Sequence, residues 1–404
     1  MAHSLSAFAA VPWSAEVTIR VCIRGLCYDG ASAIRYLLYP YRIEFVDEME
    51  KADLAICRDR LDFSKPMIRL VGKRLPSEQL GMFDHGNGVV DLPYDLLRGC
   101  SERFKSILKP RVALAYRLAT QSRLQYNVIP SPIRNALLRS RSVDSNLSFH
   151  LANETVRKAL RHAFRNLGFE LERRNPFLFL MTHDVESEKG LNKALSFKRI
   201  DDELGVRSTW FITSDEYPIS KTVARELSEG STIGSHDVRH DGRLMHIRQH
   251  QALVERLRTS RLHLERTFDK EVRSFRAPLL QFSENMIFGL GGAGYRFDFS
   301  VPCWEPIHPA TMGGFGIEAV QSFEMHGVIE FPLTLFQDHQ VLSVLGMSTR
   351  EAVKLWTRQA RLVREFDGDI VVLVHPDYAF SQDLRGYRDL LTSLLEVHTQ
   401  CIAS

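Results

Sequence analysis

The chain has 404 residues, which is longer than one ordinary hydrophobic core, so two domains are expected. Hydrophobic residues make up 44% of it and charged residues 25%, which is the profile of a soluble globular protein. The net charge of +3 is spread along the chain and is too weak to indicate a nucleic-acid partner.

The first segment, MAHSLSAFAAVPW, lacks the basic n-region of a signal peptide, and Pro12 interrupts its apolar stretch. No run of the sequence approaches the roughly 18 apolar residues of a membrane span. The six cysteines are scattered and form no CxxC pair, as expected for reduced thiols. These features predict a cytoplasmic protein without a membrane span, and they leave its oligomeric state open.

Residues 16–75 alternate short apolar strands with helical stretches, which predicts a small α/β unit. The strands are expected at 16–23, 42–47, 52–58 and 66–72. Residues 81–99 resemble a loop with short elements, and helices are expected over 101–126 and 150–168. Two prolines in 127–135 indicate a linker. We therefore expect an N-terminal α/β domain over residues 1–150 and a second domain over residues 151–404.

From Pro176 onward, seven apolar strands alternate with helices. The strands are expected at 176–184, 206–213, 231–236, 272–278, 295–300, 328–335 and 370–376, and the helices at 191–204, 219–229, 246–268, 283–290, 349–366 and 384–398. This alternation predicts parallel pairing with right-handed crossovers, in a barrel or an open sheet. Polar residues stand at the carboxyl ends of five strands, where active sites of such barrels lie: Asp184, His236, Arg276, Asp298 and His375.

Asp184 and Glu186 follow the first of these strands and are two residues apart. Alternation in an extended chain sends both carboxylates to the same side. One carboxylate could then bind a cation while the other holds a proton. The alternative is a polar strand end that caps the next helix.

His236 and His240 are four residues apart, a spacing that places both rings on one face of a helical turn. Asp237 stands where a zincin motif requires glutamate, so that class of metalloprotease is excluded. Two histidines and one carboxylate with open positions form a catalytic Zn²⁺ pattern. Mn²⁺, Co²⁺, Ni²⁺ and Fe²⁺ also fit such a divalent-metal site.

Four further residues have both a functional and a structural interpretation. Arg276 could keep a neighbouring carboxylate ionised, and Asp298 could hold another site residue by a hydrogen bond. His375, at the end of the last strand, is placed to act as a general acid. Trp304 could bind substrate by stacking on a sugar ring, although simple packing is the favoured interpretation for it.

In their order, these motifs resemble those of the polysaccharide deacetylase family, the NodB-like or carbohydrate esterase 4 group, over roughly residues 176–400. THDVES is similar to the family's TFDDG, and HDVRH to its H-[ST]-x-x-H. RAPL, DFS and LVH are similar to its RxPY, D-S-S and L-x-H motifs. The resemblance implies a distorted (β/α)7 barrel of NodB type, with the smaller N-terminal α/β domain outside it.

The resemblance also implies roles for the site residues. Asp184 would be the general base, paired with Arg276, and His375 would be the general acid, oriented by Asp298. Three residues would hold the metal: Glu186, His236 and His240. The implied reaction is metal-dependent removal of an N-acetyl group from an amino sugar in a glycan or glycan precursor. A deformylase or amidase acting on a lipid-linked or small amide, and an inactive carbohydrate-binding protein, remain as alternatives.

Overall fold

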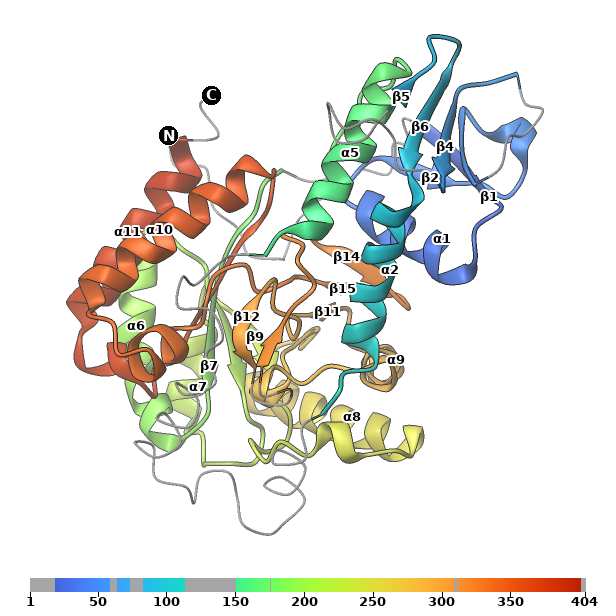
Figure 1. Cartoon of the computed structure of the whole chain (residues 1–404). Helices are drawn as coiled ribbons and strands as arrows, with labels where there is room; N and C mark the ends of the chain where they lie inside the picture. The colour runs from blue at the N-terminus through green and yellow to red at the C-terminus, as the bar shows by residue number, and fades with distance from the viewer. Residues whose placement is uncertain are drawn as a thin grey trace.

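A computed structural model of the chain describes residues 19–58, 64–72, 83–112, 150–174, 176–308, 311 and 313–400. It contains a small α/β unit and a larger α/β domain (Figure 1). The expected linker at 127–135 and the end of the helix expected over 101–126 lie outside the described residues. Within the described ranges, every helix is too short or too polar to cross a membrane.

The small unit has one sheet with the strand order β2-β1-β3-β4-β6-β5. Its strands are β1 (Ile19–Arg24), β2 (Ile43–Phe45), β3 (Leu54–Cys57), β4 (Met67–Val71), β5 (Phe83–Asp84) and β6 (Val89–Pro93). All neighbours pair in parallel except β5, which is antiparallel to β6. The first four match the predicted strands. The segment 81–99 is more regular than predicted, because it contains β5, β6 and the start of a helix.

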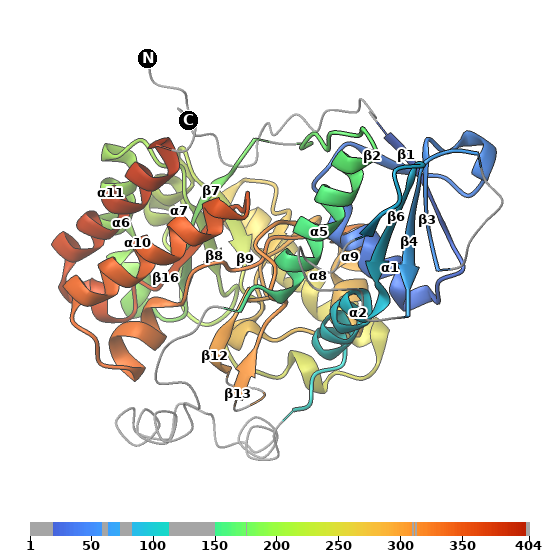
Figure 2. The same cartoon turned by 45° about the horizontal axis from the view of Figure 1, so that its top comes forward.

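Three helices belong to this unit: α1 (Tyr28–Leu38), α2 (Tyr94–Leu108) and α5 (Ala152–Asn166). Helix α2 begins at Tyr94, seven residues before the expected start. The buried residues of α1 include Ile34, Leu37 and Leu38, spaced so that one face of the helix is apolar. Figure 2 shows the three helices between the small sheet and the larger domain. They therefore cover one face of the sheet and also join the two parts of the chain.

The larger domain is built on an eight-stranded sheet with the order β14-β15-β11-β10-β9-β8-β7-β16. Its strands are β7 (Phe179–Val185), β8 (Thr209–Ile212), β9 (Thr232–Ser235), β10 (Ser274–Phe275), β11 (Phe297–Asp298), β14 (Phe323–Met325), β15 (Val328–Glu330) and β16 (Ile370–Val374). Seven of them pair in parallel, and β14 is antiparallel to β15. The seven predicted strands are confirmed.

The sheet curls into a distorted barrel, as predicted. Residues 333–335 bridge its two sides: Leu333 makes an isolated parallel bridge to Pro302, and the Leu335 N–H donates to the Val371 carbonyl at 3.3 Å. The barrel interior is filled by a separate apolar cluster: Leu180, Phe211, Leu280, Phe299, Phe331, Leu333, Val371 and Leu373. The interior is therefore a packed core, and the free space lies at the ends of the strands.

The helices of this domain are α6 (Glu188–Glu203), α7 (Lys221–Ser228), α8 (His250–Phe268), α9 (Glu284–Ala293), α10 (Thr349–Glu365) and α11 (Leu384–Gln400). A short antiparallel pair, β12 (Glu305–His308) and β13 (Gly313–Phe315), stands apart from the main sheet. Four of these helices, α6, α7, α9 and α10, begin with a serine cap, and Ser348 of α10 also forms a capping box with Glu351.

Helix α5 contacts both parts of the chain. The Arg157 guanidinium donates to the Leu37 carbonyl at 2.7 Å, on the side of the small unit. On the other side, the Asn153 amide donates to the Ile317 carbonyl at 2.6 Å, and Glu154 accepts from the Val320 N–H at 2.7 Å. Because α5 contacts both parts, these contacts do not assign it to one of them. The expected domain boundary at residue 150 therefore stays a prediction.

Candidate active site

Strand β7 places its residues on two opposite sides. Thr182 and Asp184 face Arg276, whereas His183 points the other way, stacks on Trp210 at 4.1 Å and lies 3.1 Å from an Asp201 carboxylate oxygen. All seven residues of the strand are buried. The alternation predicted from the sequence therefore separates a reactive side from a side that anchors the strand to its helices.

Asp184 is held by a buried arginine. Arg276 Nη1 donates to Asp184 Oδ1 at 2.9 Å and to Thr182 Oγ1 at 2.8 Å, while Nε donates to the Phe299 carbonyl at 3.0 Å. Burial alone would raise the pKa of Asp184, but the charges of Arg276, His236 and His375 lower it below its ordinary value. Asp184 is therefore ionised at neutral pH, and its second oxygen lies 3.8 Å from His236 Nε2.

Three side chains form a candidate metal centre: Glu186, His236 and His240 each offer one ligand atom, and these atoms lie within 4.8 Å of one another. The Nδ1 atom of His236 is 2.8 Å from the Arg276 carbonyl, to which it donates in the neutral tautomer. Its Nε2 is buried and has no hydrogen-bond partner among the described residues. Burial lowers the pKa of His236 to about 4, so the ring is neutral. Two imidazoles and a carboxylate fit a divalent metal ion.

Glu186 is fixed from several directions. Its Oε1 lies 3.0 Å from His240 Nε2 and 3.6 Å from His375 Nε2. The Tyr378 hydroxyl donates to Oε2 at 2.5 Å, and the Glu186 N–H donates to Asp377 at 3.1 Å. Burial would raise the pKa of Glu186, but His240, His375 and the Tyr378 hydroxyl lower it well below its ordinary value.

Sequence reasoning missed Asp377 and Tyr378. A signal was present in the sequence, because both residues lie within three positions of His375 in the segment HPDY and therefore follow the same strand end. Asp377 also accepts from the Ser187 hydroxyl, the cap of α6. The end of β16 thus holds the backbone and the side chain of the residue that follows β7.

The expected helical turn between His236 and His240 is absent from the structure. Residues 236–240 form an irregular segment, and Asp237 has a φ of +67°, which no right-handed helix contains. The two rings still lie 5.4 Å apart, centroid to centroid. The correct feature of the prediction was the proximity of the histidines, and the reason given for it was wrong.

His375 is oriented by Asp338, and the expectation that Asp298 does so is wrong. The distance from His375 Nδ1 to Asp338 Oδ1 is 2.6 Å, and the His375 N–H donates to Oδ2 at 3.0 Å. Burial would lower the pKa of His375, but Asp338, Glu186 and Asp184 raise it to about 10. Asp338 also caps a π-helical turn, His339–Val344, so its backbone is fixed by a neighbouring element.

Asp298 contacts other groups. Its Oδ1 accepts from the Phe299 N–H at 2.9 Å and from the Ser300 hydroxyl at 2.6 Å, and it lies beside Glu330 on the neighbouring strand. Burial raises its pKa to about 6. The Ser300 hydroxyl in turn accepts from the Ala277 N–H at 2.9 Å. Asp298 therefore shapes the segment that follows Arg276 and makes no contact with His375.

Trp304 and its neighbour Glu305 lie at the start of the β12–β13 pair. The Trp304 ring stacks on the His150 ring at 4.0 Å, so this face of the indole is already covered. Substrate binding by Trp304 stays a prediction. Glu305 was not singled out from the sequence, yet it is completely buried and close enough to His375 to interact with its charge. Burial raises the pKa of Glu305 to about 8.

The segment that carries most of the site residues matches a known family. Residues 182–297 match the family model described as polysaccharide deacetylase, and this segment contains Asp184, Glu186, His236, His240 and Arg276. This match supports the resemblance of the barrel to the NodB-like polysaccharide deacetylases. It supports carbohydrate deacetylation as the general class of reaction. No curated protein sequence matches the chain.

Several solved structures are similar to about half of the chain. A putative polysaccharide deacetylase from Mycobacterium smegmatis has 16% identity over 54% of this chain and 82% of that chain, with a TM-score of 0.45. The chitin deacetylase of the fungal pathogen Colletotrichum lindemuthianum has 15% identity over 55% and 83%, with a TM-score of 0.37. A CE4 family pseudoenzyme from Bacillus anthracis has 14% identity over 54% and 61%, with a TM-score of 0.34.

Proposed function

We propose that this chain is a metal-dependent deacetylase that removes an N-acetyl group from an amino sugar in a glycan or glycan precursor. The observation that carries the proposal is the division of labour between the two carboxylates at the end of β7. Asp184 pairs with the Arg276 guanidinium, whereas Glu186 faces the imidazoles of His240 and His375. This difference in partners supports a role for Asp184 in accepting a proton and a role for Glu186 in binding a metal ion.

The chain's own residues supply the proton transfers. A divalent metal held by Glu186, His236 and His240 would polarise the acyl oxygen and acidify the attacking water. Asp184, kept ionised by Arg276, accepts the proton of that water. His375 donates a proton from Nε2 to the leaving amine, while Asp338 holds its Nδ1. After one turnover Asp184 carries a proton and His375 lacks one, so the transfer of one proton from Asp184 to His375 through solvent returns both to their starting states.

The identity of the metal and the substrate can be tested on one preparation. We expect the purified full-length chain to bind one equivalent of Zn²⁺, or of Mn²⁺, Co²⁺, Ni²⁺ or Fe²⁺, and to release acetate from a panel of nucleotide-linked and free N-acetylated sugars. Formate release in place of acetate would favour the deformylase alternative. If the chain binds no metal and releases no acyl group, the carbohydrate-binding alternative would be favoured. A cytoplasmic location also stays a prediction, and it favours precursors over mature polymers.

The role of Asp184 is tested by Asp184→Asn. We expect the variant to lose turnover by about 10²–10⁴-fold, because an amide cannot accept the proton, and to retain metal binding. Asp269→Asn is a matched control, because Asp269 is exposed in the left-handed conformation after α8, which asparagine also tolerates. Full activity of Asp184→Asn would refute its assignment as the base.

A further inference from the structure

The metal-binding histidines stand on an irregular loop that must be held in place by other groups. The His236 N–H donates to the Ile212 carbonyl at 2.8 Å, which fixes the start of the loop to β8. Asp237 follows with a positive φ, and its side chain is completely buried. A buried carboxylate in this conformation requires partners that compensate for its burial. The partners it has therefore determine where the loop runs.

Those partners come from helix α8. Arg256 Nε lies 3.0 and 3.1 Å from the two Asp237 oxygens, and Nη2 lies 2.6 Å from Oδ2. The same Nη2 donates to Asp241 Oδ1 at 2.8 Å. One guanidinium thus binds the residue after His236 and the residue after His240. Its planar fork fits two carboxylates at once, which an ammonium group cannot reproduce.

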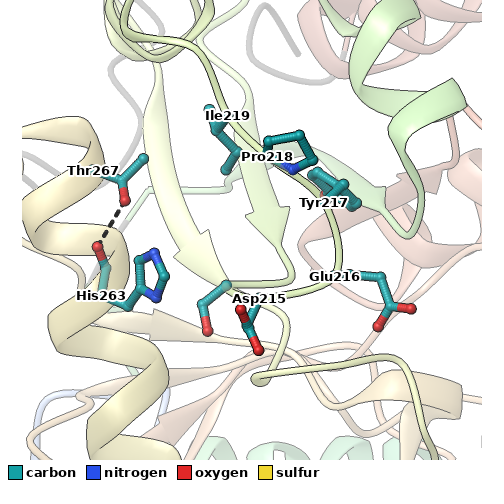
Figure 3. A pocket seen from close by; sticks show the side chains of 8 residues that line it. Asp215, Glu216, Tyr217, Pro218, Ile219, His263 and Thr267 are labelled. Carbon is teal, nitrogen blue, oxygen red and sulfur yellow. Dashed lines mark hydrogen bonds between the residues drawn. The ribbon is translucent and has the colours of Figure 1, made fainter.

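The opposite side of the loop is held differently. The N–H groups of Ser214 and Asp215 donate to the carbonyls of Asp237 and Val238 at 3.0 and 2.9 Å, and Glu216 accepts from the His240 N–H at 3.1 Å. Figure 3 shows the hollow behind this segment.

The hollow is a pocket of about 410 Å³ between the segment after β8 and helix α8, two turns beyond Arg256 (Figure 3). Residues 214–219 line one side of it, and His263 and Thr267 of α8 line the other. The pocket therefore separates α8 from the segment that receives the loop's backbone hydrogen bonds. The loop itself is connected to α8 by the ion pairs of Arg256 with Asp237 and Asp241.

We propose that Arg256, with Asp237 and Asp241, is a positioning group that sets the spacing of His236 and His240 and thereby the metal affinity of the site. The inference rests on the proposed function, since it assumes that these histidines bind a metal. Residues that orient metal ligands without touching the ion typically change metal affinity 10–100-fold when replaced. Arg256 is such a residue by its contacts, although α8 carries none of the three proposed ligands.

The test measures the Zn²⁺ dissociation constant of the full-length chain by competition with a chelator. We expect Arg256→Met to weaken binding 10–100-fold, because Asp237 is left buried without its cation. The Zn²⁺ dissociation constant of Arg256→Lys should lie between those of Arg256→Met and the wild type. The double variant Asp237→Ser with Arg256→Met leaves no unpaired charge at position 237, but it also removes the link to α8, so it should still weaken Zn²⁺ binding by about tenfold or more. Arg258→Met, two residues along α8 and partly exposed, is the control and should bind as the wild type does.

A second readout separates positioning from simple stabilisation. Zn²⁺ should raise the melting temperature of Arg256→Met less than that of the wild type, because the shift depends on affinity. A purely structural role would lower the melting temperature without metal and leave the Zn²⁺-induced rise unchanged, and that result would overturn the proposal.

Unaltered Zn²⁺ affinity in Arg256→Met would also overturn it, while leaving the proposed function intact. A wild-type chain that binds none of the divalent metals would overturn both. If Arg256→Met does not fold, the same comparison of Arg256→Lys and the double variant with the wild type decides the question.

Discussion

The small sheet and the barrel are both built from parallel strands, yet their charged groups differ. In the small sheet, Arg20 and Asp53 form a pair that is at least a third exposed, and the buried Asp91 carboxylate is bound by Arg69 and His85. In the barrel, Asp184 and Arg276 are buried, and His236 Nε2 lacks a hydrogen-bond partner within the part of the chain that the structure describes. A buried polar atom without a partner is costly unless a ligand completes it. The two regions therefore differ in that the ion pairs of the small sheet are exposed or fully partnered, whereas those of the barrel surround an atom that a ligand could complete.

The largest effect should come from Asp338, because it orients the proposed acid. We expect Asp338→Asn to lower kcat by about 10²–10⁴-fold while metal affinity stays unchanged. Asp389→Asn, on the exposed side of α11, should leave kcat unaltered. Normal turnover in Asp338→Asn would mean that the barrel's buried His375–Asp338 pair is structural, like the pairs of the small sheet.

Gly190 offers a steric test of the same end of the barrel. A Cβ at this position would overlap the Asp377 carboxylate, which holds the Glu186 N–H. We expect Gly190→Ala to lower the free energy of unfolding by about 1–3 kcal/mol and to weaken metal binding. Lys189→Ala, at the exposed neighbouring position, is the control. Chemical unfolding and metal titration should show lower stability and weaker metal binding for Gly190→Ala than for Lys189→Ala. Equal stability and equal metal affinity in the two variants would contradict the role given to Asp377.

Glu305 gives a pH dependence with a definite sign. Its pKa is raised by burial from 4.5 to about 8, so the folded state holds a proton that the unfolded state releases. This contribution to stability is fully present below pH 4.5 and is lost as the pH rises through 8. Relative to the wild type, Glu305→Gln should gain stability over this window by at most about 1.4 kcal/mol per pH unit. Urea unfolding of both proteins from pH 5 to 9 would reveal this gain. A difference in free energy of unfolding that stays constant with pH would contradict the raised pKa of Glu305.

The smallest effect is expected in the small sheet. Arg20→Gln removes an ion pair that water and salt already screen, so the free energy of unfolding should change by less than about 1 kcal/mol. Metal affinity and turnover should stay as in the wild type. A large loss in either would show that the small unit contributes to the site and would remove the contrast between the two regions.

The sequence predicted the barrel well because each of its strands is a short apolar run that ends in polar residues. The reactive side of β7 followed from the alternation of side chains. Asp338 could not be identified in this way, because it lies in a connection whose path brings it to β16 only in the folded chain. The loop after β9 was mispredicted for a similar reason. Its shape depends on Arg256, which lies 19 residues beyond Asp237.

Helices α1 and α2 cover strand β14, and this contact limits where the chain can be cut into stable fragments. β14 is the antiparallel strand at the end of the barrel's sheet, and its Phe323 packs against Tyr36 of α1 and Phe104 of α2. A fragment that began near residue 176 would expose this strand edge and its aromatic side chain to solvent. Exposed edges of that kind recruit further strands. Expression trials of the barrel alone should therefore yield aggregates, whereas fragments that retain α1, α2 and α5 keep the edge covered.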